Sequence, residues 1–314
     1  MMKVAFIFPG QGSQLVGMGK ELVDSNEKSG SYYKDADRIL GFELSTLILE
    51  GPQDKLTLTY NAQPSLLTVG SMIASRLRDE GIVPDYTAGH SLGEYTALVA
   101  SGVISFEEGV SIVHKRGLFM NDAVPAGEGA MAAILGLGQE QVKEVTDVIT
   151  ADGHPVQPAN LNCPGQIVIS GTKAGVEKAC IRLKEVGARR AIPLDVSGPF
   201  HSSLMKPAAE QLSITLDAVK MEDATIPLVA NVNASVVTNS EKIKKQLVEQ
   251  LYSPVLWEDS VRTMLDLGVT HFVECGPGKV LSGLVKKINR DVNVYPVYDE
   301  LTLQEVINAS KGWS

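Results

Sequence analysis

A Gly-His-Ser-Leu-Gly sequence at residues 89–93 constrains the fold more than any other feature of this chain. It ends a short apolar segment, 84–90, that we expect to form a strand, and it begins an apolar segment, 92–101, that we expect to form a helix ending before Gly102. A G-x-S-x-G pattern between a strand and a helix is typical of a sharp turn that holds its serine in a strained backbone conformation. An ordinary glycine-flanked turn is the alternative interpretation.

Predicted strands and helices alternate on both sides of this motif. Residues 3–8 are an apolar run that ends at a Pro-Gly pair, which predicts a buried strand leading into a glycine-rich loop. Residues 65–80 predict a helix, and Ser105 with Glu108 has the capping-box pattern that begins another helix. The alternation predicts an α/β protein whose parallel sheet is covered by helices on both faces.

The pattern changes after a glycine-punctuated stretch near residue 127. The expected elements then follow the order strand, helix, strand, strand, helix, strand, which is the ferredoxin-like order. We expect them at residues 130–135, 139–150, 156–161, 166–170, 174–186 and 190–196. The α/β pattern resumes with a strand at 226–231 and a strand, turn and helix over 271–288. These segments predict a large α/β domain from residues 1–127 and 197–314, with a small inserted subdomain at 128–196.

Composition excludes several classes of protein. The chain is 44% hydrophobic and 21% charged, which is ordinary for a globular protein. No apolar run approaches the roughly 20 residues that cross a bilayer, and the N-terminus does not resemble a signal peptide, so we expect no membrane association. The net charge of −9 argues against nucleic-acid binding. Nothing resembles a coiled-coil repeat or a large apolar stripe, so a monomer is expected.

Cysteine and histidine spacing argues against disulfides and metals. The three cysteines, Cys163, Cys180 and Cys275, are scattered and have no CxxC spacing. The five histidines form no HxxxH pair. We therefore expect a reducing, cytoplasmic environment and no structural metal.

Ser91 is the candidate nucleophile, because the motif projects its hydroxyl at the start of a helix, where backbone N–H groups face developing negative charge. A serine nucleophile needs a base. His201 is the best candidate, since a Gly-Pro pair places it in a rigid turn just past a predicted strand. A surface or core histidine is the alternative for His201. His90 adjoins Ser91, and we expect it to point away.

Two further features are candidates for binding. The Gly-Gln-Gly loop at 10–12 follows the first predicted strand, and its N–H groups could supply an oxyanion-hole donor. Arg116 lies on the helix after the motif helix. It either faces solvent or points into the site, where its planar fork would suit a carboxylate.

Five motifs occur in the order found in malonyl-CoA:acyl carrier protein transacylases, and the whole chain resembles that family. They are Phe-Pro-Gly-Gln-Gly-Ser-Gln at 8–14, Gly-His-Ser-Leu-Gly-Glu-Tyr at 89–95, Arg116, Gly-Pro-Phe-His-Ser at 198–202 and Gly-Pro-Gly at 276–278. The resemblance implies an α/β-hydrolase-like core that carries the ferredoxin-like subdomain. It also implies a coenzyme A thioester as substrate and no permanently bound cofactor.

The resemblance assigns roles to individual residues. It implies that Ser91 attacks the thioester of malonyl-CoA, with His201 as general base, and that Arg116 pairs with the malonyl carboxylate. It also implies that the backbone N–H groups of Gln11 and Leu92 form the oxyanion hole and that the backbone carbonyl of Gln250 holds the histidine. Phe200 is implied to lie beside a tight acyl pocket, and Asn160 and Asn162 in a segment that lines the cleft. Loop-capping asparagines are the alternative for the last two.

The implied acceptor is the phosphopantetheine thiol of holo-acyl carrier protein, in fatty acid biosynthesis. A discrete polyketide-pathway acyltransferase, a serine thioesterase and a catalytically silent carrier-docking module are the alternatives. Because both the chain and such carriers are acidic, docking needs a local basic patch. The candidates are Arg189 with Arg190, and Lys286 and Lys287 with Arg290, although solvated surface charge explains either cluster equally well.

Overall fold

The computed structural model describes residues 2–125, 127–196 and 198–313. A six-stranded sheet has the strand order β10-β9-β1-β2-β7-β8, and its strands pair in parallel except for β7 with β8. The strands are β1 Lys3–Phe8, β2 Tyr86–Gly89, β7 Leu228–Val229, β8 Val236–Val237, β9 Val269–Cys275 and β10 Asn293–Val297. A parallel sheet in an α/β protein is therefore confirmed.

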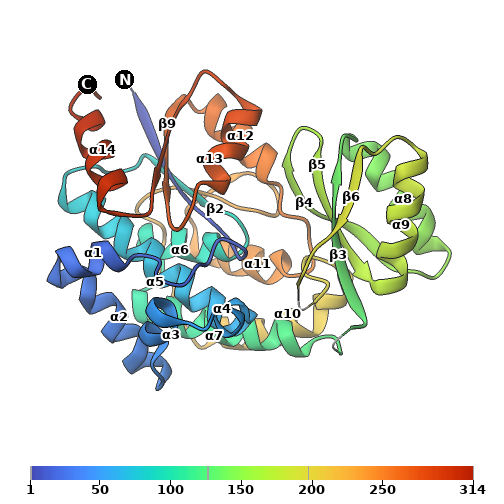
Figure 1. Ribbon diagram of the computed structural model, residues 1–314, viewed down its shortest axis with the longest axis horizontal. Coiled ribbons are helices and arrows are strands. Elements are labelled where there is room, and N and C mark those ends of the chain that lie inside the picture. The colour runs from blue at the N-terminus through green and yellow to red at the C-terminus, as the bar shows by residue number, and fades with distance from the viewer. Residues whose placement is uncertain (1, 126, 197, 314) are drawn as a thin grey trace.

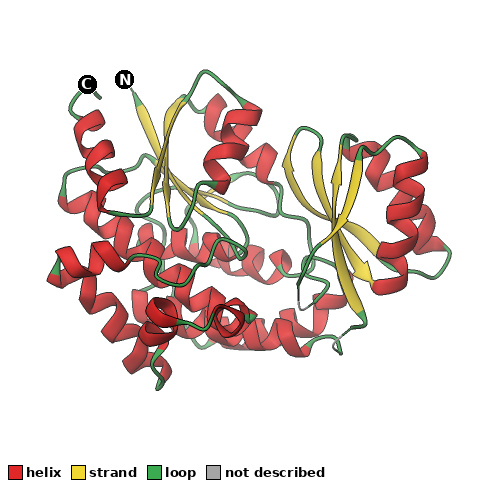
Figure 2. Cartoon of the chain, in the orientation of Figure 1, coloured by secondary structure: helices red, strands yellow, loops and turns green. Residues whose placement is uncertain are grey.

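Helices cover both faces of this sheet (Figures 1 and 2). Helices α5 (Thr59–Asp79), α6 (Leu92–Ala100) and α7 (Phe106–Asp122) lie on one side, and α12 (Trp257–Asp266) and α13 (Val280–Ile288) lie on the other. Successive side chains of a strand point to opposite faces. Phe6 and Phe8 of β1 accordingly join one buried cluster, while Ala5 and Ile7 join the other, which explains the uninterrupted apolar run.

A separate four-stranded antiparallel sheet has the strand order β4-β5-β3-β6. Its strands are β3 Gly129–Leu135, β4 Val156–Cys163, β5 Gln166–Thr172 and β6 Arg190–Pro193. Helices α8 (Gln139–Ala151) and α9 (Lys173–Glu185) pack on one face, at the right of Figure 1. The six elements follow the order expected from the sequence. Strand β4 also pairs at Asn160 with Val255, which ties this sheet to the segment before α12.

Three expected strands are shorter than predicted, and the one expected at 84–90 covers only Tyr86–Gly89. The strand expected at 190–196 ends at Pro193, one residue before the last bond to β3, in which the N–H of Leu194 donates to the carbonyl of Met131 at 2.9 Å. The strand expected at 226–231 covers only Leu228–Val229, since the backbone of Asn231 turns to other partners. The helix expected at 65–80 begins earlier, at Thr59.

Several helices had no counterpart in the sequence analysis. They are α1 Lys20–Ser25, α2 Glu27–Leu40, α3 Leu44–Glu50, α4 Gln53–Thr57, α10 Lys206–Asp217, α11 Ser240–Gln250, α12 and α14 Glu300–Ser310, with a 3-10 turn at Ser203–Met205. In the part of the chain described, no helix is both long and apolar enough to span a membrane.

Candidate active site

Ser91 occupies the turn between β2 and α6 with a strained backbone, at φ 50° and ψ −105°. The flanking glycines allow the turn because the chain crosses itself there. A Cβ on Gly89 would lie 1.9 Å from the carbonyl of Gly93, and one on Gly93 would lie 2.0 Å from the carbonyl oxygen of Phe8. The close approach explains why this motif carries glycine at both positions, and it rules out an ordinary open turn.

His201 lies directly against the hydroxyl of Ser91. The Oγ atom of Ser91 is 2.7 Å from Nε2 of His201, and Nδ1 of His201 is 2.8 Å from the backbone carbonyl oxygen of Gln250. A carbonyl can only accept, so Nδ1 carries the proton and Nε2 is free to accept the proton of Ser91. His201 is buried at 3% exposure, so the surface-histidine alternative is wrong.

Arg116 is buried beneath the nucleophile, and the solvent-facing alternative is wrong. Its side chain is 1% exposed. One terminal nitrogen donates to Oε1 of Gln63 at 2.7 Å, and the other donates to Oε1 of Gln250 at 2.8 Å and to Oγ of Ser91 at 3.2 Å. The guanidinium carbon also lies 5.2 Å from the ring centroid of Tyr95. A rigid cation therefore lies next to the reacting hydroxyl.

Burial and the charge of Arg116 set the protonation of the site. Burial first, and then the charge of Arg116, lower the pKa of His201 to about 3, against the opposing effect of the hydrogen bond to the Gln250 carbonyl. His201 is therefore neutral near pH 7 and can act as a base. Burial raises the pKa of Glu94 to about 7, against the opposing effects of Gln250, Asn231 and Arg116.

A cavity of about 440 Å³ opens above Ser91 and His201, between the two sheets. Gln11 and Leu92, the expected oxyanion-hole residues, both line it. Leu92 begins α6, where the first N–H groups of a helix have no acceptor within the helix. Part of the cavity wall is apolar and is formed by Met120, Met131, Leu194, Val196 and Phe200. The cavity suits a small acyl group near Arg116.

Asn160 and Asn162 lie within strand β4, so the loop-capping alternative is wrong. Asn160 lines the cavity. Oδ1 of Asn162 is instead 2.9 Å from Nε2 of His90. This bond directs the His90 ring to the strand rather than to the hydroxyl of Ser91. Among the described residues, no group of three or more His, Cys, Asp or Glu side chains could hold a metal ion.

Three residues at the site had no role in the sequence analysis. Gln63 anchors Arg116, Glu94 accepts a hydrogen bond from Nε2 of Gln250 at 2.7 Å, and Oδ1 of Asn231 accepts one from the backbone N–H of Ser91 at 2.8 Å. Glu94 lay inside a quoted motif, but no local pattern marked Gln63 or Asn231. Only the folded chain brings them together.

Comparison with known families agrees with this geometry. The model of the acyl transferase domain matches residues 5–302. This chain belongs to the acyl transferase domain family. The match confirms the family resemblance inferred from the motifs.

The family relatives extend over nearly the whole chain. A malonyl CoA-acyl carrier protein transacylase from Bacillus subtilis (strain 168) is 57% identical over 311 residues, which are 99% of this chain and 98% of the relative. One from Staphylococcus aureus (strain MSSA476) is 47% identical over 314 residues, covering 100% of this chain and 99% of the relative.

Solved structures of acyl transferases superpose closely on this one. An acyl carrier protein S-malonyltransferase from Vibrio cholerae O1 biovar eltor str. N16961 has a TM-score of 0.95 at 44% identity, covering 97% of this chain and 99% of the other. A malonyl-transacylase in complex with its type II PKS acyl-carrier protein has a TM-score of 0.95 at 40% identity, covering 98% of this chain and 99% of the other.

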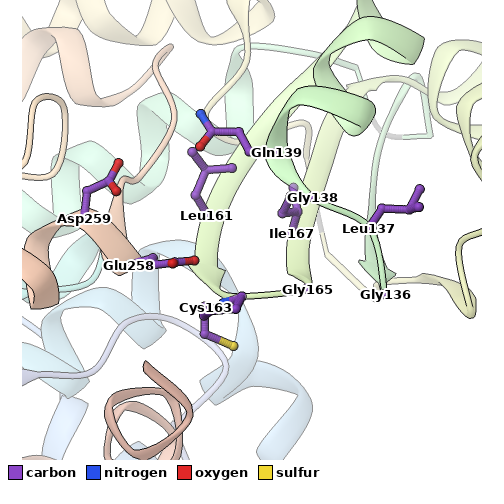
Figure 3. Close-up of a pocket in the computed structure, with 11 residues that line it drawn as sticks. Gly136, Leu137, Gly138, Gln139, Leu161, Cys163, Gly165, Ile167, Glu258 and Asp259 are labelled. Atoms are coloured by element: carbon purple, nitrogen blue, oxygen red, sulfur yellow. The ribbon is translucent and has the colours of Figure 1, made fainter. Parts of the chain in front are cut away.

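A second cavity, also of about 440 Å³, is drawn in Figure 3, and neither Ser91 nor His201 lines it. Figure 3 shows Glu258 of α12 near Leu161 and Cys163 of β4, with the loop before α8 on the far side. Among the described residues, those that line this cavity form no hydrogen bond with Ser91 or His201. It is not part of the acyl pocket of this transferase.

Both basic clusters adjoin this second cavity. The Arg189 side chain packs against Gly136, which lines it. Nζ of Lys287 is 3.2 Å from Oε1 of Gln166, next to the lining residue Gly165. Arg189 and Lys287 are exposed, so their charges remain available to an acidic partner.

Proposed function

We propose that the protein transfers the malonyl group of malonyl-CoA to the phosphopantetheine thiol of acyl carrier protein, through a malonyl ester of Ser91, for fatty acid biosynthesis. The names of the relatives support the substrate and the acceptor. The observation that carries the proposal is the buried Arg116 guanidinium, 3.2 Å from the nucleophile oxygen. A cation held there fits an acyl group that ends in a carboxylate.

The first half-reaction forms the acyl-enzyme. Oγ of Ser91 attacks the thioester carbonyl while Nε2 of His201 takes its proton. The backbone N–H groups of Gln11 and Leu92 hold the negative oxygen of the tetrahedral intermediate. The intermediate collapses, the carbon–sulfur bond breaks, and the protonated His201 returns the proton to the coenzyme A sulfur.

The second half-reaction reverses these roles. The carrier thiol gives its proton to His201 and attacks the carbonyl of the malonyl-serine ester. Collapse breaks the ester bond, and His201 protonates the Oγ atom of Ser91. The Gln250 carbonyl keeps the ring oriented throughout, in the place that an aspartate has in other serine enzymes.

Finer aspects of the fold and location belong to the same proposal. We classify residues 1–127 and 197–314 as an α/β-hydrolase-like catalytic domain and 128–196 as a ferredoxin-like subdomain. The strand–helix–strand–strand–helix–strand order supports the second assignment. We further propose that the enzyme works in the cytoplasm as a monomer without a permanently bound cofactor, consistent with coenzyme A and carrier thioesters as its only substrates.

The test is an acid-quenched incubation with radiolabelled malonyl-CoA, followed by a chase with holo-acyl carrier protein. Label that remains on the protein and then moves to the carrier supports the transferase. Free malonate without protein-bound label would favour a thioesterase, and neither product would favour a docking module. Chasing with fatty acid and polyketide carriers in parallel separates the two pathways.

The depressed pKa of His201 predicts an unusual pH profile. Between pH 6.5 and 5, the acylation rate should change less than about twofold, whereas a histidine with its ordinary pKa of 6.5 would lose roughly 15-fold. The range lies below the pKa of about 7 of Glu94, so that carboxyl stays largely protonated. Single-turnover acylation measured at each pH checks this.

Stability must be followed in the same experiment. Because the unfolded chain protonates His201 at its ordinary pKa, the contribution of His201 to stability falls as the pH drops from 6.5 toward 3. The raised pKa of Glu94 contributes with the opposite sign as the pH drops from 7 toward 4.5. Circular dichroism at each pH therefore separates unfolding from titration of the base. A rate that falls with a midpoint near 6.5 in folded protein would contradict a neutral, buried base.

Charge reversal tests carrier docking beside the second cavity. Arg189→Glu and Lys287→Glu should each raise the KM for holo-acyl carrier protein several-fold and leave the KM for malonyl-CoA unchanged, because only the carrier is a large acidic partner. Lys34→Glu is the matched control, since Lys34 is exposed on α2. Helix α2 lies at the opposite end of the molecule from the four-stranded sheet (Figure 1). An unchanged carrier KM would exclude that residue from the docking surface.

A further inference from the structure

We propose that Asn231 is a positioning residue for the nucleophile, because its side-chain amide takes the place of a strand backbone beside the Ser91 turn. The proposal rests on the proposed role of Ser91. Asn231 is fully buried and follows β7 in the chain. Neither its sequence context nor its distance along the chain from Ser91 indicated this role.

The pairing of β2 with β7 shows what the side chain replaces. These strands pair in parallel with Ala88 opposite Val229, and the N–H of Thr87 donates to the carbonyl of Pro227 at 3.0 Å. In a parallel ladder, one residue bonds to the two residues that flank its partner. Continued by two residues, the ladder would place the backbone of Asn231 between the carbonyl of Gly89 and the N–H of Ser91.

The Asn231 backbone does not make those bonds. Its N–H instead donates to Oε2 of Glu94 at 3.3 Å, and its carbonyl accepts from the N–H of Leu256 at 2.9 Å. The side chain makes them. Nδ2 of Asn231 donates to the carbonyl of Gly89 at 2.7 Å, and Oδ1 accepts from the N–H of Ser91 at 2.8 Å.

Asparagine suits this position because its amide carries the same donor and acceptor as a peptide group. The extra reach of the side chain matters, since the positive φ of Ser91 turns its peptide out of the plane of the sheet. The two bonds hold both ends of a strained turn whose conformation would otherwise relax. Burial keeps water from competing for them.

The same side chain also connects the nucleophile to the base. Nε2 of Gln250 donates to Oδ1 of Asn231 at 3.3 Å, while the carbonyl of Gln250 accepts from His201. Because the N–H of Ser91 is occupied by Asn231, the next amide, that of Leu92, is the one left for the oxyanion. Asn231 thus sets the relative position of the hydroxyl, the imidazole and the oxyanion donor.

Asn231→Asp and Asn231→Ala test the proposal. Aspartate keeps the shape and the acceptor but removes the donor to Gly89. We expect single-turnover acylation to slow about 100-fold in both variants, because a small displacement of the reacting groups costs a factor of this size. The dissociation constant for malonyl-CoA should stay within about threefold of the wild-type value. Asn233→Asp, the same change at an exposed position two residues away, should leave both values unchanged.

Serine reactivity toward a fluorophosphonate gives a readout that does not need malonyl-CoA. Slow phosphonylation of folded Asn231 variants supports the proposal even if the acyl donor proves to be different. Acylation and phosphonylation within about threefold of wild type, in variants that are folded by circular dichroism, would overturn it. Should Asn231→Ala fail to fold, the isosteric Asn231→Asp decides by the same two rates. Loss of labelling in wild type itself would count against the proposed function instead.

Discussion

Ser91→Ala should lower the rate of malonyl transfer by roughly 10⁶-fold, the scale of loss when a serine enzyme loses its nucleophile. The variant has no hydroxyl to form the ester, and the rest of the site can only bind the thioester. Protein-bound label after acid quenching should disappear, and label should no longer reach the carrier. The measurement is single-turnover transfer from radiolabelled malonyl-CoA, with the variant checked for contaminating wild type.

Ser203→Ala is the control for this experiment. Ser203 lies two residues from His201, but its side chain is exposed and outside the acyl cavity. Its variant should acylate at the wild-type rate. If the protein-bound label persisted in Ser91→Ala and was lost in another serine variant, the malonyl ester would be on that other serine, and the proposed mechanism would be contradicted.

Arg116→Ala should lower malonyl transfer and reduce the preference for malonyl over acetyl by up to about 10⁴-fold, the discrimination that a buried polar recognition group can supply. In the wild type, acetyl would leave a desolvated guanidinium without its carboxylate partner. Without Arg116, neither acyl group gains an ion pair. The values to compare are kcat/KM for malonyl-CoA and for acetyl-CoA.

The ratio of the two values is the sound readout, because Arg116→Ala also removes the buried donors to the side-chain oxygens of Gln63 and Gln250 and so lowers stability. A smaller amount of folded enzyme changes both kcat/KM values equally and cancels in the ratio. Arg116→Lys keeps the charge but lacks the planar fork, and should give an intermediate ratio. A malonyl preference unchanged in Arg116→Ala would exclude this residue as the carboxylate partner.

Much of the chemistry could be predicted because it depends on local backbone constraints. The turn at Ser91 needs glycine at positions 89 and 93, where any side chain would collide with the backbone. The five-residue motif therefore predicts the strand–turn–helix geometry around the serine. The apolar run of β1 and the capping box at Ser105 are similarly local signals, and both elements occur where expected.

Element boundaries and small helices were less predictable. The segment 20–57 forms four helices that were not expected from the sequence; α2, α3 and α4 pack against α5, and α1 packs against α2. Helices α1, α3 and α4 have seven residues or fewer, and helices this short depend on tertiary packing more than on propensity. The strand expected at 226–231 is shortened to Leu228–Val229 by tertiary contacts, since the backbone of Asn231 bonds to Glu94 and Leu256 in place of β2.

The sequence by itself determined the family, the α/β alternation and the candidate nucleophile and base, because short motifs carry the required glycines and reactive groups in a fixed order. Only the tertiary structure decided that Arg116 points to Ser91, and that Gln63, Glu94 and Asn231 support the site. These contacts join residues far apart in the chain, such as Gln250 and Ser91 at a separation of 159. No local pattern specifies such a pair, since its geometry exists only after the sheet and its helices have packed.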